Sequence, residues 1–176
     1  EVTSGVRADA IAENNRKTQE AFYTGAQGDE LMRYSQEYTG LETFETIRTT
    51  TIYDYNADDS MKTSIVYKEA IGISVEDNVA TPNTTVTDPQ TVLLSVKKQA
   101  TYYSGAKGEE QMVYSQSYAN GIADKTTLYT YVSGALNFSE TYKTDAEVTS
   151  GVKADAEAQN NRKTQEAFYT GAQGDE

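Results

Sequence analysis

The stretch YTGAQGDELMRYSQEY (residues 23–38) recurs in modified form as YSGAKGEEQMVYSQSY (residues 103–118). In both copies an aromatic run leads into a loop with two glycines, and a second run follows in which apolar and polar residues alternate. Alternation with a period of two places every second side chain on one face of a β-strand. The stretch therefore predicts a β-hairpin with one apolar face, and its recurrence predicts that the hairpin is used more than once.

The loops of these hairpins carry residues that suit tight turns. We expect Gly25, Gly28, Gly105 and Gly108 to adopt positive φ, because glycine has no Cβ to resist that conformation. Two further segments, residues 53–67 (YDYNADDSMKTSIVY) and 129–142 (YTYVSGALNFSETY), follow the same scheme. The chain is thus predicted to contain four hairpins, at about residues 17–38, 45–68, 97–118 and 125–142.

Tyrosine is the dominant large side chain, with 14 tyrosines against 4 phenylalanines and no tryptophan. Its ring buries a large apolar area while its hydroxyl stays hydrogen-bonded, so it suits a half-buried strand. The serines between the tyrosines, Ser35, Ser115 and Ser139 among them, are expected on the wetter face. The expected packing residues are Tyr23, Tyr34, Tyr38, Tyr55, Tyr67, Tyr103, Tyr114, Tyr118, Tyr131 and Tyr142.

A second repeat has a much longer period. Residues 1–30 recur as residues 147–176 with three differences, Arg7 to Lys153, Ile11 to Glu157 and Glu13 to Gln159. Residues 1–146 therefore form one repeat unit, and residues 147–176 begin the next, as in a fragment of a longer repetitive polypeptide. Poor apolar spacing over residues 5–21 and their copy, residues 151–167, favours a loop over a short helix, with position 157 facing solvent.

An isolated hairpin is only marginally stable in water, so four hairpins with apolar faces must pack against one another. Residues 70–89 contain both prolines and are predicted to be an extended connector. Because each unit can pack on the next, the expected fold is all-β, with tandem hairpins forming an extended β-solenoid, spiral sheet or tube.

The composition excludes several classes of function. The chain has no histidine and no cysteine, so it lacks the usual catalytic dyads and zinc ligands, and its net charge of −12 opposes binding to nucleic acid. The sequence contains no apolar run long enough for a membrane-spanning helix. We expect no enzymatic activity, no cofactor, no nucleic-acid partner and no membrane span.

Three groups of residues deserve a functional interpretation beside a structural one. Asp54, Asn56 and Asp58 alternate like the start of a calcium-binding loop, but the later ligand positions do not match, so an acidic turn is favoured. Carboxylates follow both glycine loops, where they discourage unwanted strand pairing rather than catalyse hydrolysis. The triplets at residues 83–85 and 137–139 match the N-glycosylation pattern and are candidate glycan sites if the protein is exported, although such triplets are also frequent by chance in a threonine-rich chain.

The tyrosine-centred hairpins resemble the YD-repeat family of teneurins and bacterial toxin shells, mainly through Tyr53-Asp54-Tyr55 and the turn that follows. The resemblance implies hairpins wound into a spiralling sheet. Together with the repeats, it leads us to expect an extracellular structural protein that associates with itself and builds a fibre, tube or surface layer. The alternatives are an adhesin or glycan-binding repeat of a cell-surface protein, whose tyrosines stack on sugars, and the wall of a toxin shell.

Overall fold

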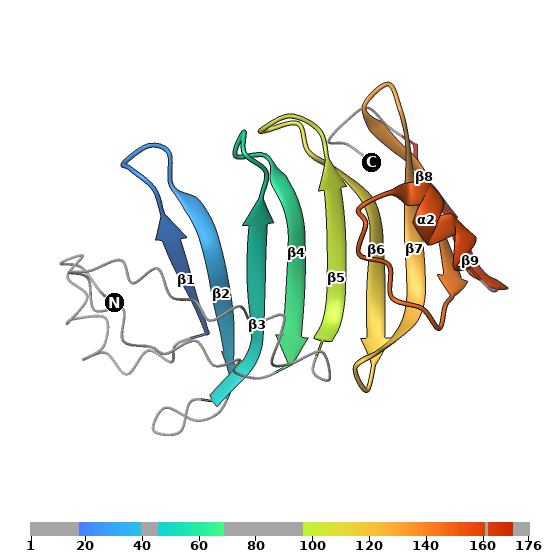
Figure 1. Ribbon diagram of the computed structural model, residues 1–176, viewed down its shortest axis with the longest axis horizontal. Coiled ribbons are helices and arrows are strands. Elements are labelled where there is room, and N and C mark those ends of the chain that lie inside the picture. Colours follow the sequence, from blue (N-terminus) through green and yellow to red (C-terminus); the bar gives the residue numbers. More distant parts are fainter. Residues whose placement is uncertain (1–17, 40–45, 69–96, 161, 171–176) are drawn as a thin grey trace.

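The computed structural model describes residues 18–39, 46–68, 97–160 and 162–170. They form one nine-stranded antiparallel sheet in which the strands follow chain order, so that each strand pairs with its sequence neighbours (Figure 1). The expectation of an all-β sheet of hairpins is confirmed. The predicted connector at residues 70–89, the triplet at residues 83–85 and most of residues 5–21 lie outside the described residues.

The nine strands are between 6 and 11 residues long. Their bounds are β1 Gln19–Thr24, β2 Leu31–Thr39, β3 Thr46–Tyr55, β4 Met61–Lys68, β5 Lys97–Ser104, β6 Gln111–Ala119, β7 Ile122–Val132, β8 Ala135–Lys143 and β9 Arg162–Phe168. The four predicted hairpins correspond to β1–β2, β3–β4, β5–β6 and β7–β8. Hairpins are themselves joined by antiparallel pairing, which makes the sheet a single meander.

The tightest connections use two-residue turns with positive φ. Asn120 and Gly121 join β6 to β7 with φ of 52° and 78°, and Ser133 and Gly134 join β7 to β8 with φ of 53° and 86°. Positive φ at both central residues is the geometry of a type I′ turn, whose twist matches that of the flanking strands. The sheet therefore continues directly from β6 into β7 through a two-residue hairpin turn.

The predicted loop at residues 151–167 is wrong. This segment contains a one-and-a-half-turn helix, α2 (Lys153–Ala158), and most of β9. The helix forms because Ala156 packs into the core with none of its surface exposed, and β9 forms because β8 offers an unpaired edge. Both causes are tertiary contacts, which apolar spacing within the segment does not reveal. Glu157 is exposed, as expected for this copy.

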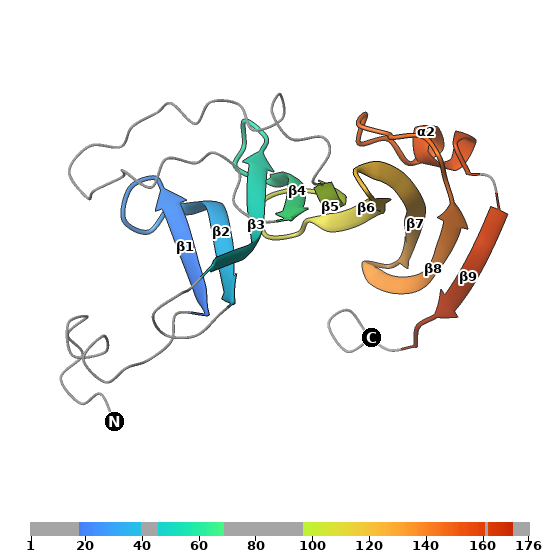
Figure 2. The ribbon, with the colours of Figure 1, turned by 90° about the horizontal axis from the view of Figure 1, so that it is seen from below.

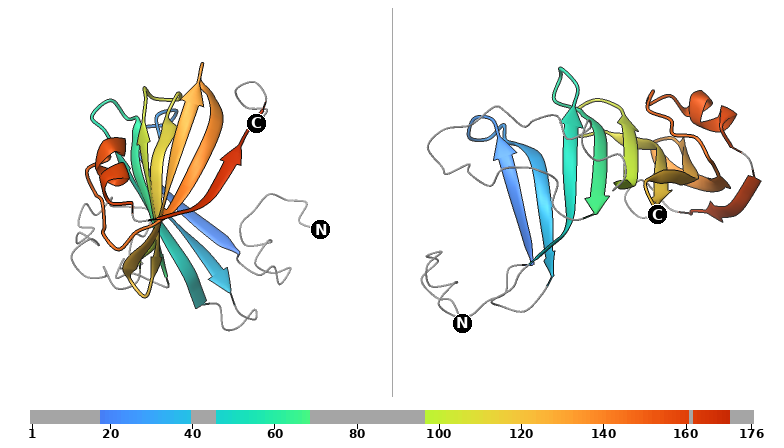
Figure 3. Two further views of the ribbon diagram at one scale, coloured as in Figure 1. Left: turned by 90° about the vertical axis from the view of Figure 1, so that its right-hand side faces the viewer. Right: turned by 60° about the horizontal axis from the view of Figure 1, so that its bottom comes forward.

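The sheet is strongly twisted. Each of its eight strand pairs contains one register shift, and bulges of this kind increase the right-handed twist of the strands. Viewed along the sheet, successive strands fan out about a common centre (Figure 3). The sheet stays open, and α2 lies over one face near β6 and β7 (Figure 2).

The core lies on the face that α2 covers. Its buried sheet residues come from β4 to β7, and the segment after β8 adds Val148 and Ala156. The full set is Ile65, Tyr67, Ala100, Tyr102, Tyr114, Leu128, Val148 and Ala156. The first residues of the second repeat therefore complete the core of the first, so the sequence boundary between residues 146 and 147 is not a structural boundary.

Candidate functional site: the junction between repeats

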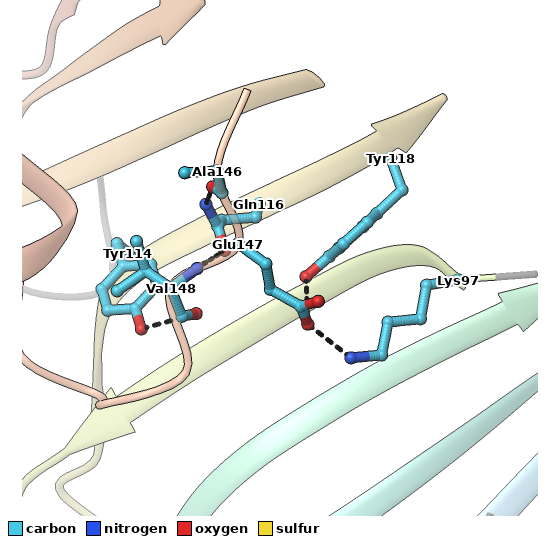
Figure 4. Close-up of polar contacts among 7 residues, drawn as sticks. All are labelled: Lys97, Tyr114, Gln116, Tyr118, Ala146, Glu147 and Val148. Carbon is cyan, nitrogen blue, oxygen red and sulfur yellow. Dashed lines mark hydrogen bonds and ion pairs between the residues drawn. The ribbon is translucent and has the colours of Figure 1, made fainter. Parts of the chain in front are cut away.

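The junction between the two repeats is built by a segment that leaves β8 and crosses the sheet. We call residues 144–152 the strap. It contacts β5, β6 and β7 on the core face before the chain turns into α2 (Figure 1). Figure 4 shows its central part, where Ala146, Glu147 and Val148 meet side chains of β5 and β6.

Gln116 of β6 is the central receptor for the strap. Its amide is fully buried, and its Oε1 accepts a hydrogen bond from the Val148 N–H at 2.8 Å. Its Nε2 donates to the Ala146 carbonyl at 3.1 Å and to the Thr126 hydroxyl at 3.0 Å. A primary amide offers both a donor and an acceptor, so one side chain satisfies two backbone groups of a segment that has no strand partner.

Tyr114 of β6 supports the next part of the strap. Its ring stacks on Tyr102 of β5, with ring centroids 4.5 Å apart. Its hydroxyl donates to the Val148 carbonyl and accepts from the Gly151 N–H, each at 3.2 Å. The ring is fully buried, so this tyrosine fills the core and binds the strap at the same time.

An ion pair fixes the outer side of the strap. Lys97 at the start of β5 donates to the Glu147 carboxylate at 2.6 Å, and the Tyr118 hydroxyl donates to the same oxygen at 3.1 Å. The lysine side chain is only 5% exposed, whereas that of Glu147 is 29% exposed. Lys97 also lies over the ring of Tyr118, 5.6 Å from its centroid. A lysine so buried requires a nearby anion, and only the strap supplies it among the described residues.

The tyrosines of this site are held in the neutral form. Burial raises the pKa of Tyr102, Tyr114 and Tyr118 above the ordinary value of 10.0. The negative charge of Glu147 adds to the effect of burial on the pKa of Tyr118. Since each phenol keeps its proton, Tyr114 and Tyr118 remain hydrogen-bond donors to the strap over the whole neutral range.

The strap is also anchored at both ends. The buried Thr144 donates from its hydroxyl to the Gln159 carbonyl at 3.1 Å, and its N–H donates to the Asp124 carbonyl at 3.0 Å. At the other end Lys153 of α2 donates to the Thr130 hydroxyl at 2.7 Å. These contacts tie the strap and α2 to β7.

The opposite face of the sheet carries a regular series of serine–tyrosine pairs. In each pair a serine hydroxyl lies 3.1–3.4 Å from the hydroxyl of a tyrosine on the next strand. The tyrosine always stands two residues beyond the serine's direct cross-strand partner. The pairs are Ser35–Tyr53, Ser64–Tyr103, Ser115–Tyr129 and Ser139–Tyr169. We refer to this series as the Ser–Tyr ladder.

The Ser–Tyr ladder explains one wrong expectation. Ser35, Ser115 and Ser139 were expected on a wet face, yet they are only 4%, 7% and 9% exposed. The tyrosine of the following strand leans across each serine and shields it from water, while its hydroxyl keeps the serine hydrogen-bonded. Residues at this diagonal spacing are within reach only of a long side chain.

The last pair of the Ser–Tyr ladder belongs to the junction with the second repeat. Ser139 lies in β8, whereas Tyr169 directly follows β9 and is the repeat copy of Tyr23. On the core face Phe138 and Phe168 are direct cross-strand partners, with ring centroids 6.1 Å apart. Lys163 of β9 forms an ion pair with Glu140 of β8, which lowers the pKa of that carboxyl. The second repeat thus adds a strand to the sheet of the first.

The structure distributes the predicted packing tyrosines over both faces. Tyr34, Tyr67 and Tyr114 are buried, Tyr38, Tyr118, Tyr131 and Tyr142 are half-buried, and Tyr103 belongs to the Ser–Tyr ladder. The half-buried Tyr55 donates to the Met32 carbonyl at 2.9 Å. Tyr23 differs from all of these, because 58% of its surface is exposed.

The predicted turn glycines all adopt positive φ, between 84° and 121°. The carboxylates that follow them support the turns: Glu30 accepts from the Gly28 N–H, and Glu110 accepts from the Gly108 N–H. Glu110 also accepts from the Met61 N–H at 3.0 Å, which links two neighbouring hairpins and lowers the pKa of its carboxyl.

The residues of the calcium candidate have protein partners. Asp54 forms an ion pair with Lys62, while Asn56 and Asp58 both bond to the Ser60 hydroxyl, at 2.9 and 2.6 Å. Asp58 and Ser60 thereby close the turn between β3 and β4. In the described part of the chain, no three acidic side chains are grouped so that they could hold a metal ion, and no helix is long and apolar enough to cross a membrane.

Sequence reasoning did not identify the strap or its receptors, Lys97 and Gln116. One signal was available, because the near-identical recurrence of residues 1–30 marks the segment that contains the strap as a unit of the repeat. Comparison with known proteins adds no further information: no protein-family model, no curated protein and no solved structure matches this chain.

Proposed function

We propose that this chain is a structural repeat, without enzymatic activity, of an extracellular array in which each unit is completed by the start of the next. One observation carries the proposal. The first 22 residues of the second repeat, Glu147–Phe168, supply two core side chains, the anion for buried Lys97 and an additional strand. A repeat that depends on its neighbour for these groups is suited to extension and not to acting alone.

The surface charge fits this role. A net charge of −12 over 176 residues gives neighbouring arrays a mutual repulsion, which keeps a long assembly dispersed. Ion pairs such as Lys163–Glu140 lie at the junction itself, where the charges are opposite. The YD-repeat resemblance supports a hairpin array. We propose that this array forms a fibre, tube or surface layer, with the wall of a toxin shell as the alternative.

Electron microscopy of polypeptides with two, four and eight tandem copies of residues 1–146 tests the proposal. We expect regular particles of constant width whose length increases in proportion to the number of copies. Flexible chains without a regular spacing, or globules that grow in all directions, would contradict it. A glycan array probed with the same polypeptides distinguishes the adhesin alternative, since specific glycan binding is expected of an adhesin and not of a purely structural array. Tyr34 and Tyr114 are buried, so a tyrosine that stacks on a sugar would have to be an exposed one such as Tyr23, and Tyr23→Ala should then abolish binding.

A further inference from the structure

The same strand sequence occurs twice in this chain, in two different settings. Residues 162–170 repeat residues 16–24 without a single change. The first copy supplies β1, which pairs with β2, and the second supplies β9, which pairs with β8. Each copy ends the sheet, so among the described residues each has a strand on one edge only.

The two pairings use opposite edges of this strand. In the first copy Tyr38 donates its N–H to the Thr18 carbonyl, so Thr18, Glu20 and Phe22 direct their backbone groups toward β2. In the second copy Tyr169 donates its N–H to the Asn137 carbonyl. Tyr169 and Ala167 therefore direct their backbone groups toward β8. They correspond to Tyr23 and Ala21, so the two sets of backbone groups do not compete.

The side chains show the same complementarity. Tyr169 contacts Ser139 of β8 and is half-buried, whereas its copy Tyr23, with no β8 beside it, is 58% exposed. Phe22 stacks on Tyr34 of β2, with ring centroids 4.3 Å apart, and is half-buried. Its copy Phe168 has no β2 beside it and is 73% exposed. The exposed Tyr23 thus lacks the contact that its copy Tyr169 makes with β8, and the exposed Phe168 lacks the contact that its copy Phe22 makes with β2.

From these relationships we infer that the outer edge of β1 is a docking site for β8 of a second copy of this chain. The register is that of β9, with Phe138 opposite Phe22, Ser139 opposite Ala21 and Ser139 also bonded to the Tyr23 hydroxyl. The inference rests on the proposed array and adds its geometry. One strand is shared by two repeats, and the sheet runs on without interruption, with eight strands for each period of 146 residues.

Amide hydrogen exchange tests this docking directly. In the chain of 176 residues, the Ala167 and Tyr169 amides should be protected and the Ala21 and Tyr23 amides should not. The second sample is a two-copy polypeptide in which an additional copy of residues 1–146 precedes the chain of 176 residues. In its second copy we expect the Ala21 and Tyr23 amides to exchange at least about tenfold more slowly, since each gains a hydrogen bond. The Glu20 and Phe22 amides should stay protected in both samples.

A proline pair provides a matched control. Ala21→Pro in the single chain removes an N–H on the outer edge of β1, where none of the described strands pairs with it. The melting temperature of this variant should therefore stay close to that of the parent. Ala167→Pro removes the equivalent N–H where it donates to β8, so the protection of Tyr169 should be lost. In the two-copy polypeptide, Ala21→Pro in the second copy should abolish the new protection of Tyr23.

Unchanged exchange of Ala21 and Tyr23 in the two-copy polypeptide would overturn the docking inference, even if that polypeptide is elongated. Loss of protection at Glu20 and Phe22 would also overturn the inference, because β1 of the second copy would then have left β2 in order to pair with β8. Small-angle scattering of the same sample reports separately on the proposed function. A two-copy particle no longer than the single chain would overturn the array itself.

Discussion

The Lys97 ammonium lies 2.6 Å from the Glu147 carboxylate, although the two residues are 50 positions apart and belong to different copies of the long repeat. The pair joins the first residue of the second repeat to the start of β5. It shows how one repeat holds the next, because the anion of the buried lysine lies on the strap.

Glu147→Ala should detach this part of the strap and destabilise the chain by about 1–3 kcal/mol, since it leaves a buried ammonium without its anion. Urea unfolding measures the loss. Asp54→Ala is the matched control, because it breaks the Asp54–Lys62 pair, in which both side chains are more than half exposed. Its effect should stay below about 1 kcal/mol. Equal losses in the two variants would contradict the role given to Glu147.

Gln116→Leu should destabilise the chain by about 2–4 kcal/mol. Leucine is similar in size but leaves the Val148 N–H and the Ala146 carbonyl without their partner inside the core. The Val148 amide should then exchange much faster. Gln111→Leu is the control, because Gln111 is only half-buried and donates to the Gly134 carbonyl at the edge of a turn. A stable Gln116→Leu variant with a protected Val148 amide would show that the strap is held without this glutamine.

The two glycines of the β5–β6 turn should differ in their tolerance to alanine. A Cβ at Gly105 would lie 2.6 Å from the Glu109 carbonyl oxygen, whereas a Cβ at Gly108 would meet nothing within 4 Å. Positive φ alone costs about 1–2 kcal/mol at either position. Gly105→Ala should therefore lower the free energy of unfolding by at least about 1 kcal/mol more than Gly108→Ala does. Thermal melting of both variants measures this difference. A Gly108→Ala variant less stable than Gly105→Ala would contradict the turn geometry.

Alkaline pH should unfold the chain through its buried tyrosines. Burial raises the pKa of Tyr102, Tyr114 and Tyr118 above 10.0 in the folded state. Their contribution to stability is complete below pH 10.0 and is lost as the pH rises above it, because the unfolded phenols ionise first. An absorbance titration of tyrosinate should show a late group of phenols that ionises together with loss of the β-sheet signal. Ionisation of all tyrosines near pH 10 before unfolding would contradict this.

Acid should weaken the β8–β9 junction through Glu140. The hydrogen bond and charge of Lys163 hold the pKa of this carboxyl below its ordinary value of 4.5. The stabilisation is therefore complete above pH 4.5 and is lost as the pH falls toward the lower pKa of the folded state. The difference in melting temperature between the parent and Glu140→Gln should be constant near neutral pH and should shrink below pH 4.5. A difference independent of pH would show that the ion pair does not stabilise the junction.

The hairpins and their turns could be predicted from the sequence because their causes are local. The alternation around Tyr34 and Tyr114 sets the strands, and Gly25 and Gly105 set the turns, each within a few residues of the structure they determine. The near-identical recurrence of residues 1–30 likewise fixed the long period.

The tertiary structure alone decided how the repeats are joined. Whether residues 151–167 form a loop or a helix and a strand depends on what β6, β7 and β8 offer them. Whether Ser35 is wet or dry depends on a tyrosine of the neighbouring strand. The partners of the strap, Lys97 and Gln116, are polar residues in a sheet of polar residues, and no pattern along the chain distinguishes them. Contacts between residues 30 or more positions apart leave no periodic trace, because their energy depends on the distance in space and not on the spacing in sequence.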